Sequence, residues 1–321
     1  MPPVFELDRL TVRFATEAGE VAAVSELSLA IAPGECIGIV GESGSGKSQT
    51  FLAALGLLAA NGRATGRALY RGQDLLGLGR AELDRIRGDR IAMIFQDSGT
   101  SLTPHMRIGD QLMEVLTVHK GPSDEAAHRR VVEVMEAMRI PDIDKRLRQY
   151  PHEFSGGMRQ RVMIAMALAC EPDLLIADEP TTALDVTVQA QILNLFRALK
   201  HHTRSSIVLI THDLGVVAGL CDRVLVMYGG RLVEEAPVAE LFTAPKHPYT
   251  QGLLRCMPRL DQPLDRELEA IPGQPPNLQN LPPGCAFAER CAHATARCAE
   301  RPPLRPLSPT RRAACHLLEA A

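Results

Sequence analysis

Residues 41–48 read Gly41-Glu42-Ser43-Gly44-Ser45-Gly46-Lys47-Ser48: a glycine, four further residues and then Gly-Lys-Ser. This is the spacing of a phosphate-binding loop, which lies between a strand and a helix. Residues 35–40 form a short apolar run that predicts a buried strand, and residues 51–60 are apolar on almost every side, as in a buried helix. Because both flanks fit, a phosphate loop is favoured over a chance Gly/Ser segment.

The residue types in the loop suit phosphate binding. Glycines let the backbone wrap around phosphate oxygens with its N–H groups pointing inward, and the helix N-terminus adds a favourable dipole. Lys47 supplies a positive charge for the β- and γ-phosphates, and Ser48 supplies a hydroxyl for Mg²⁺. Phe14 is placed to stack on a base, and a position in the core of a strand is the alternative. The predicted nucleotide-binding residues are Phe14, Gly41, Glu42, Ser43, Gly44, Ser45, Gly46, Lys47, Ser48 and Gln49.

The composition of the whole chain narrows its class. Its 321 residues suffice for one large domain plus an extension, or for two domains, and 45% hydrophobic residues can form a sizeable core. The 35 basic and 38 acidic residues give a net charge of −3, which offers no electrostatic footprint for nucleic acid. No apolar run approaches the roughly 18–20 residues that span a bilayer, and residues 1–6 lack the features of a signal peptide. We expect a cytosolic protein or a peripheral one on the cytosolic face of the inner membrane.

Apolar runs and helical periodicity predict the remaining elements. Strands are expected at residues 5–7, 10–14, 28–31, 91–95, 174–177 and 207–210. Glycines within residues 61–95 indicate turns between short strands. Helices are expected within residues 107–150 and at residues 158–169 and 186–200. Together these elements indicate an α/β protein.

Polar residues follow three of the predicted buried strands. They are Gln96, the pair Asp178-Glu179, and His212. Ligands of open α/β sheets bind at the carboxyl ends of the strands, so we expect these side chains at one edge. There Asp178 can hold Mg²⁺ through water, and Glu179 can orient and polarise an attacking water. One alternative is that the two carboxylates are merely solvated, and the phosphate loop upstream argues against it. The other is a structural histidine, and the expected sheet edge shared with Gln96 and Glu179 argues against that.

A Ser155-Gly156-Gly157 segment precedes the predicted helix at residues 158–169 and forms another potential anion site. With it, the order of the phosphate loop, Gln96, Asp178-Glu179, Asp185 and His212 resembles that of ABC-type ATPases. The resemblance covers residues 4–240. It implies a RecA-like core with an antiparallel β subdomain and a helical subdomain at about residues 97–170, followed by a small irregular cysteine-rich extension over residues 241–321.

The resemblance also implies how ATP is held. Two such domains pair head to tail and sandwich two ATP molecules. Lys47 and the magnesium ligands Ser48, Gln96 and Asp178 serve the chain's own nucleotide, with Glu179, His212 and Gln96 as catalytic residues. Asp185 communicates across the dimer interface. The residues that face the partner's γ-phosphate are Ser155, Gly156, Gly157, Met158 and Gln160.

Three longer segments, at residues 151–161, 177–185 and 247–254, resemble ATPase subunits of bacterial dipeptide and oligopeptide importers, of the type called D. Met158 stands where a glutamine is common, and residues 97–104 depart slightly from the family's usual Asp-Pro-x-Thr-Ser-Leu-Asn-Pro. The resemblance implies two transmembrane permease subunits, a sister ATPase in a heterodimer or a second copy in a homodimer, and an extracytoplasmic binding protein. Nickel chelates or glutathione as cargo, or a soluble ATPase without transport, are the alternatives.

The last 81 residues hold 13 of the 23 prolines and five of the eight cysteines, which marks a boundary near residue 240. Cys285, Cys291, Cys298 and Cys315 are separated by five, six and sixteen residues. Because cytosolic proteins rarely keep disulfides, four clustered thiols favour a metal. Zn²⁺, a [4Fe–4S] cluster and no metal remain open, and the family resemblance favours the cluster. Cys36, Cys170 and Cys221 are scattered singly and are expected to be buried.

Overall fold

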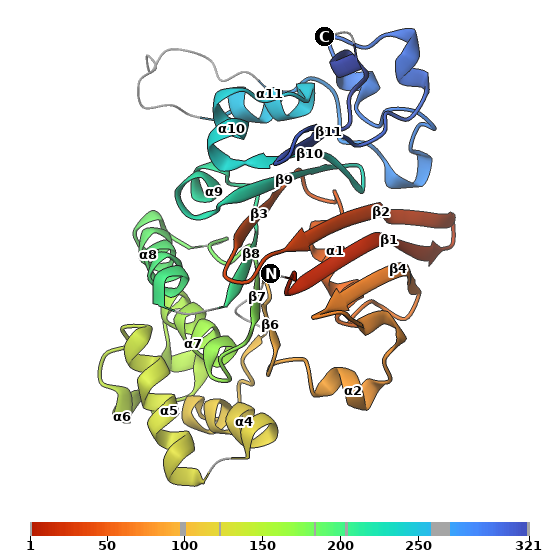
Figure 1. Cartoon of the computed structure of the whole chain (residues 1–321). Coiled ribbons are helices and arrows are strands. Elements are labelled where there is room, and N and C mark those ends of the chain that lie inside the picture. The colour runs from red at the N-terminus through yellow and green to blue at the C-terminus, as the bar shows by residue number, and fades with distance from the viewer. Residues whose placement is uncertain are drawn as a thin grey trace. The chain divides into compact units, whose positions relative to one another are not determined.

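The computed structural model describes residues 2–96, 101–121, 123–182, 184–202, 205–257 and 270–319. Its chain divides into two units, each built from segments that are distant in sequence (Figure 1). Unit 1 comprises Met1–Val4, Ala32–Glu35 and Gly77–Leu209, and unit 2 comprises Phe5–Ile31, Cys36–Leu76 and Ile210–Ala321. Residues 97–100, part of the segment that departs from the family pattern, lie outside the described residues.

An antiparallel sheet in unit 2 contains β1 (Phe5–Thr16), β2 (Gly19–Ile31), β4 (Gly62–Tyr70) and β5 (Gln73–Asp74), in the order β2-β1-β4-β5. The prediction of separate strands at residues 5–7 and 10–14 was wrong, because β1 is continuous. Its pairing register with β2 shifts between Leu7 and Leu10, and Arg9 has a φ of 48°. Such an irregularity breaks the alternation of buried and exposed side chains. The sequence pattern is therefore interrupted at this point, although the strand continues.

The second set of strands in unit 2 begins with β3 (Cys36–Val40), which is buried throughout and pairs in parallel with β9 (Arg223–Tyr228). Beyond β9 the sheet continues with β10 (Arg231–Pro237), then β12 (Arg311–Ala313) and finally β11 (Arg305–Ser308). Each of these strands is antiparallel to the strand before it. The unit's helices are α1 (Lys47–Ala54), α9 (Leu214–Leu220), α10 (Val238–Thr243) and α11 (Pro248–Arg255).

Helix α1 ends at Ala54, earlier than the predicted end at residue 60. Gly56 has a φ of 63°, and its N–H donates to the Ala53 carbonyl. The Leu57 N–H donates to the Leu52 carbonyl, 2.8 Å away. A glycine in the left-handed conformation with such closing hydrogen bonds is a common helix end. The helix therefore ends here, although the apolar sequence continues to residue 60.

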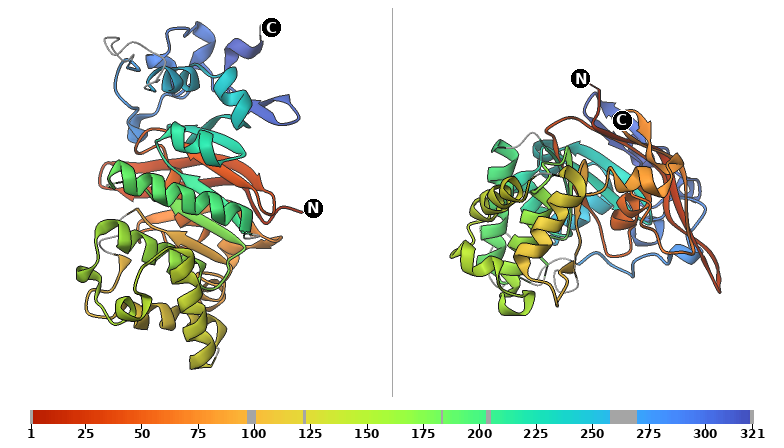
Figure 2. Two further views of the ribbon diagram at one scale, coloured as in Figure 1. Left: turned by 90° about the vertical axis from the view of Figure 1, so that its left-hand side faces the viewer. Right: turned by 90° about the horizontal axis from the view of Figure 1, so that it is seen from below.

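Unit 1 holds β8 (Ser206–Ile210), β7 (Leu174–Asp178) and β6 (Ile91–Ile94), with β6 and β7 parallel. Its helices are α2 (Arg80–Asp84), α4 (Ile108–Lys120), α5 (Asp124–Ala137), α6 (Ile143–Leu147), α7 (Gly156–Leu168) and α8 (Val186–His202). Helices α4 to α7 pack on one another, as the yellow-to-green ribbons of Figure 2 show. The Ser123 hydroxyl accepts from the Ala126 N–H and caps α5.

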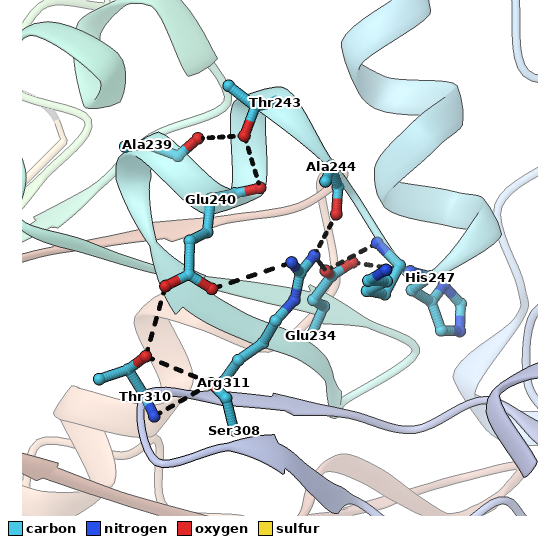
Figure 3. A network of polar contacts seen from close by, with 10 residues as sticks. Glu234, Ala239, Glu240, Thr243, Ala244, His247, Ser308, Thr310 and Arg311 are labelled. Carbon is cyan, nitrogen blue, oxygen red and sulfur yellow. Dashed lines mark hydrogen bonds and ion pairs between the residues drawn. The ribbon is translucent and has the colours of Figure 1, made fainter. Parts of the chain in front are cut away.

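The C-terminal residues join unit 2 through a buried ion pair (Figure 3). Glu234 in β10 is fully buried, and its carboxylate lies 2.6 Å from the guanidinium of Arg311 in β12, which is 5% exposed. The carboxylate also accepts hydrogen bonds from the backbone N–H groups of Lys246 and His247. Arg311 donates further to the Ala244 carbonyl. With so many partners, the buried charge of Glu234 is satisfied only while the C-terminal hairpin is docked.

Replacing Arg311 by methionine leaves this buried carboxylate without its counter-charge. We expect the free energy of unfolding to fall by about 3–5 kcal/mol. The control is Arg301→Met, which removes an ion pair with Glu26 whose two side chains are 40% and 56% exposed. That change is expected to cost at most about 1 kcal/mol. Urea unfolding of both variants measures the difference, and equal losses contradict the assignment.

Candidate functional site

The phosphate loop lies in unit 2, between β3 and α1, where neighbouring strands approach its backbone closely. A Cβ atom on Gly41 would lie 2.2 Å from the carbonyl oxygen of Met227 in β9. A Cβ atom on Gly46, whose φ is 95°, would lie 2.2 Å from the carbonyl oxygen of Ala23 in β2. Since neither backbone can retreat easily, only glycine fits at both positions.

Lys47 is the first residue of α1 and is only 6% exposed. Its ammonium group donates to the carbonyl oxygens of Gly41 (2.8 Å) and Glu42 (2.9 Å). The positive charge is thus held over the loop, where a phosphate group would compete for it. Ser48 and Gln49 follow on α1 and are half-buried.

Glu42 connects the loop to the C-terminal part of the chain. Its backbone N–H donates to the hydroxyl of Tyr249 (3.0 Å), and its carboxylate lies 2.8 Å from the guanidinium of Arg290. The Arg290 side chain is 7% exposed, and it also donates to the hydroxyl of Tyr228. Burial alone would lower the pKa of Arg290, but the hydrogen bonds with Glu42 and Tyr228 raise it above its ordinary value. Arg290 is therefore charged at every physiological pH.

Four rings pack around this connection. The centroids of Tyr228 and Tyr249 are 4.5 Å apart, and Phe287 lies 5.2 Å from Tyr228 and 5.9 Å from His247. Burial lowers the pKa of His247 to about 4, with the charge of Glu234 opposing the shift. The His247 Nδ1 accepts from the Tyr249 N–H, which requires that nitrogen to be unprotonated. Burial, with the Glu42 carboxylate second, raises the pKa of Tyr249.

In unit 1 the structure brings Gln96 and Glu179 together. The Gln96 side-chain N–H donates to the Glu179 carboxylate (3.1 Å), and the Thr182 hydroxyl donates to the same oxygen (2.8 Å). Glu179 has a φ of 48°, a conformation that non-glycine residues adopt rarely and that clusters at functional sites. Asp178, the last residue of β7, is 5% exposed. Gln96 and Thr182 thus orient the carboxylate of Glu179, a type of group that can serve as a base for an attacking water.

The predicted partner-facing residues lie at the start of α7. The Ser155 hydroxyl accepts from the Met158 N–H and caps the helix. A Cβ atom on Gly157 would lie 2.5 Å from a methyl group of Val188, so this glycine lets α7 and α8 approach closely. Asp185 caps α8 by accepting from the Val188 N–H (2.9 Å). Ser155 and Gly156 are exposed, whereas Gln160 is 3% exposed and belongs to the core of unit 1.

Two further predicted residues lie in unit 2. His212 is exposed and precedes α9. Phe14 is half-buried in β1, with its ring against Gly62, where an added Cβ would lie 2.7 Å from a ring carbon. Both a stacking role and a packing role for Phe14 are compatible with this position.

All eight cysteines are free thiols. Cys36, Cys170 and Cys221 are buried, as expected. In the C-terminal segment the Cys285 N–H donates to the Cys298 carbonyl (2.9 Å). Burial raises the pKa of Cys285, Cys291 and Cys315. A backbone hydrogen bond to each thiol opposes this shift, and neighbouring thiols add to it. Among the described residues, however, no three His, Cys, Asp or Glu side chains form a group that could hold a metal ion. The predicted iron–sulfur site is not supported by this geometry.

Sequence reasoning did not select Arg290, Tyr228 or Glu234. Arg290 lies 248 positions from Glu42, and no local pattern links the two. His247-Pro248-Tyr249 begins the third segment that resembles the importer ATPases, and all three residues are buried in unit 2. None of the helices in the described part of the chain is both long enough and apolar enough to cross a membrane.

A glycine-rich loop between a buried parallel strand and a helix, with a lysine held over it, defines a phosphate-loop nucleotide-binding protein. Comparison with known proteins narrows this class. A profile of ABC transporters matches residues 24–182, and a profile of the C-terminal region of oligopeptide/dipeptide transporters matches residues 233–298.

The chain is 55% identical over 312 residues to the oligopeptide transport ATP-binding protein OppD of Salmonella typhimurium, covering 97% of this chain and 93% of that one. OppD of Escherichia coli is also 55% identical, over 95% of this chain and 90% of its own length. The chain therefore belongs to the family of oligopeptide transport ATP-binding proteins of ABC transporters.

Solved structures agree on the fold. The dimeric ATP-binding cassette MJ0796, bound to ADP and phosphate, matches with a TM-score of 0.65 at 28% identity, over 73% of this chain and 98% of that one. The cassette cbiO1 from Clostridium perfringens, part of the ABC transporter complex cbiONQ, matches with a TM-score of 0.65 at 26% identity, over 76% of this chain and 92% of that one. The chain has the fold of an ABC ATPase domain.

The buried His247 predicts a pH dependence of stability. Its pKa of about 4 in the folded protein is below the value of 6.5 for an exposed histidine, so the unfolded chain binds more protons. Stability falls as the pH drops from about 6.5 to 4, by about 3 kcal/mol from this group. In His247→Asn the side-chain amide oxygen can still accept from the Tyr249 N–H. Because asparagine does not titrate, the loss of stability between pH 6.5 and pH 4 should disappear. Urea unfolding of both proteins between pH 7 and pH 4.5 measures it, and parallel stability curves contradict the prediction.

Proposed function

We propose that this chain is the ATP-hydrolysing subunit that powers oligopeptide uptake through an ABC importer. The observation that carries the proposal is the 55% identity to oligopeptide transport ATP-binding proteins over nearly the whole chain. The oriented carboxylate of Glu179 and the phosphate loop support the chemistry, which converts ATP and water into ADP and phosphate. Dipeptides are included as cargo, since the matching C-terminal profile covers both classes of transporter.

We assign Lys47 to the β- and γ-phosphates and Glu179 to the attacking water. Gln96 and Thr182 hold the Glu179 carboxylate in one orientation by donating to it. Because Gln96 donates through its amide nitrogen, its oxygen remains for Mg²⁺, a cation that prefers oxygen ligands. Ser48 and Asp178 supply the other oxygens, and Mg²⁺ neutralises phosphate charge when bound. His212 is assigned to the same γ-phosphate.

The transport cycle proposed here needs a second ATPase domain. Ser155, Gly156, Gly157 and Met158 are assigned to the partner's nucleotide, and the exposure of Ser155 and Gly156 supports this. Gln160 is buried in unit 1 and is not assigned to it. ATP binding closes the head-to-tail dimer, hydrolysis reopens it, and Asp185 couples the two sites. The partner is a sister ATPase or a second copy. The ATPase dimer binds two permease subunits at the cytosolic face of the membrane. An extracytoplasmic binding protein delivers the cargo to these permease subunits.

We further propose that residues 1–240 form the nucleotide-binding domain and residues 241–321 an extension that binds a metal. The support for the metal is the sequence spacing of Cys285, Cys291, Cys298 and Cys315 alone, since the described residues form no metal-binding group. The donor set of four thiols suits a [4Fe–4S] cluster or Zn²⁺. No mechanistic step depends on the metal. Anaerobically purified protein should contain about four irons per chain with a visible absorption band for the cluster, or one zinc without a band. Folded and active protein without either metal contradicts this part of the proposal.

Replacing Glu179 by glutamine tests the proposed chemistry. The amide keeps the size of the side chain but cannot act as a base, so we expect phosphate release to fall about 100-fold or more while ATP binding persists. The matched control is Glu171→Gln, in which an exposed glutamate of the same unit loses a surface contact with Arg130. Its rate should equal that of the parent. Hydrolysis by Glu179→Gln at the parental rate rules out the assigned role.

A further inference from the structure

We propose that the C-terminal segment positions the phosphate loop: Arg290 and Tyr249 hold Glu42 in place and thereby set the affinity for ATP. The inference rests on the proposed binding of ATP at this loop. All the residues concerned belong to unit 2. Arg290 and Tyr249 are positioning residues, since they act on the nucleotide through Glu42.

Every polar group of Glu42 is engaged. Its N–H donates to the Tyr249 hydroxyl, and its carboxylate pairs with Arg290. Its carbonyl oxygen accepts from the Lys47 ammonium (2.9 Å) and from the Ser45 N–H (3.2 Å). Two of these anchors come from the loop itself, and the other two come from residues more than 200 positions away. The start of the loop is therefore fixed from outside.

The outer anchors are themselves rigid. Arg290 donates through Nε to the Pro272 carbonyl (2.8 Å), and its guanidinium lies 5.8 Å from the centre of the Tyr228 ring. The Tyr249 ring is fully buried and packs against both Tyr228 and Phe287. The Arg290 side chain is only 7% exposed, and its planar guanidinium makes several hydrogen bonds. The Arg290–Glu42 pair therefore keeps its geometry better than a surface ion pair does.

This anchoring matters because the loop is rich in glycine. Gly41, Gly44 and Gly46 all have positive φ values, so the free loop has large conformational freedom to lose when it closes around phosphate. A fixed Glu42 removes part of that freedom in advance, and preorganisation of this kind strengthens binding. It also fixes the two carbonyl oxygens that hold the Lys47 ammonium before it transfers to a phosphate.

A simpler electrostatic effect predicts something different. Arg290 is a cation near the loop, and Glu42 is an anion within it. If only their charges acted on ATP, Arg290→Gln would weaken binding, whereas Glu42→Gln would strengthen it. Positioning predicts that both substitutions weaken binding, because each breaks the same ion pair. The sign of the Glu42→Gln effect therefore separates the two explanations.

The experiment measures the dissociation constant of ATP for the full chain by equilibrium titration, together with KM and kcat for hydrolysis. We expect Glu42→Gln and Arg290→Gln each to raise the dissociation constant and KM about fivefold, with kcat within about twofold of the parent. The double variant should be no weaker than either single variant, since the pair is broken only once. Tyr249→Phe, which removes only the hydroxyl, should raise the dissociation constant by about twofold to threefold.

Three controls make the outcome decisive. Arg301 lies in the same C-terminal segment and forms an exposed ion pair with Glu26. Arg301→Gln breaks this pair and should leave the dissociation constant of ATP unchanged. Thermal unfolding of Glu42→Gln, whose C-terminal segment is intact, excludes general unfolding as the cause. Lys47→Ala must abolish binding; if it does not, the proposed site for ATP is wrong. If Lys47→Ala abolishes binding but Glu42→Gln binds as well as the parent or better, the positioning role alone is wrong.

Discussion

The phosphate loop is wedged between two strands at distances that admit no side chain. The backbone of Gly41 lies against the Met227 carbonyl in β9, and that of Gly46 lies against the Ala23 carbonyl in β2. Strand β9 pairs with β3, which leads into the loop, and β2 belongs to the antiparallel sheet of the same unit. The shape of the loop therefore depends on strands from both sheets. A substitution at either glycine would displace a strand rather than a side chain.

Two buried ion pairs hold the C-terminal part of the chain in place. The Glu234–Arg311 pair and the Glu42–Arg290 pair each join residues from distant parts of the sequence, and each includes a guanidinium that is no more than 7% exposed. A buried charge tolerates the loss of its partner poorly, so both pairs favour one docked arrangement of the segment over many loose ones. His247 and Tyr249 lie between Glu234 and Arg290 in the sequence. The His247 backbone N–H donates to the Glu234 carboxylate, and the Tyr249 hydroxyl accepts from the Glu42 backbone N–H.

Local patterns in the sequence revealed much of this arrangement. The spacing of the loop and the apolar run before it were sufficient to predict a loop between a strand and a helix, and a further apolar run predicted a strand that ends just before Glu179. The continuous β1 was missed because its irregularity at Arg9 interrupts the pattern. The pairing of Arg290 with Glu42 was missed for a different reason: it depends on the folded path of the chain, and neither residue has a local motif that points to the other. The four cysteines show the opposite case, since a suggestive pattern did not produce a metal-binding group among the described residues.

Phosphate release by the chain assembled with its permease subunits, measured with and without oligopeptide and binding protein, tests the central claim most directly. If cargo delivery drives closure of the ATPase dimer in the proposed cycle, phosphate release will be faster when the loaded binding protein is present. The same assay with a nickel chelate or glutathione should show no increase. A rate that oligopeptides leave unchanged, while one of those other cargoes raises it, would contradict the assignment to oligopeptide transport.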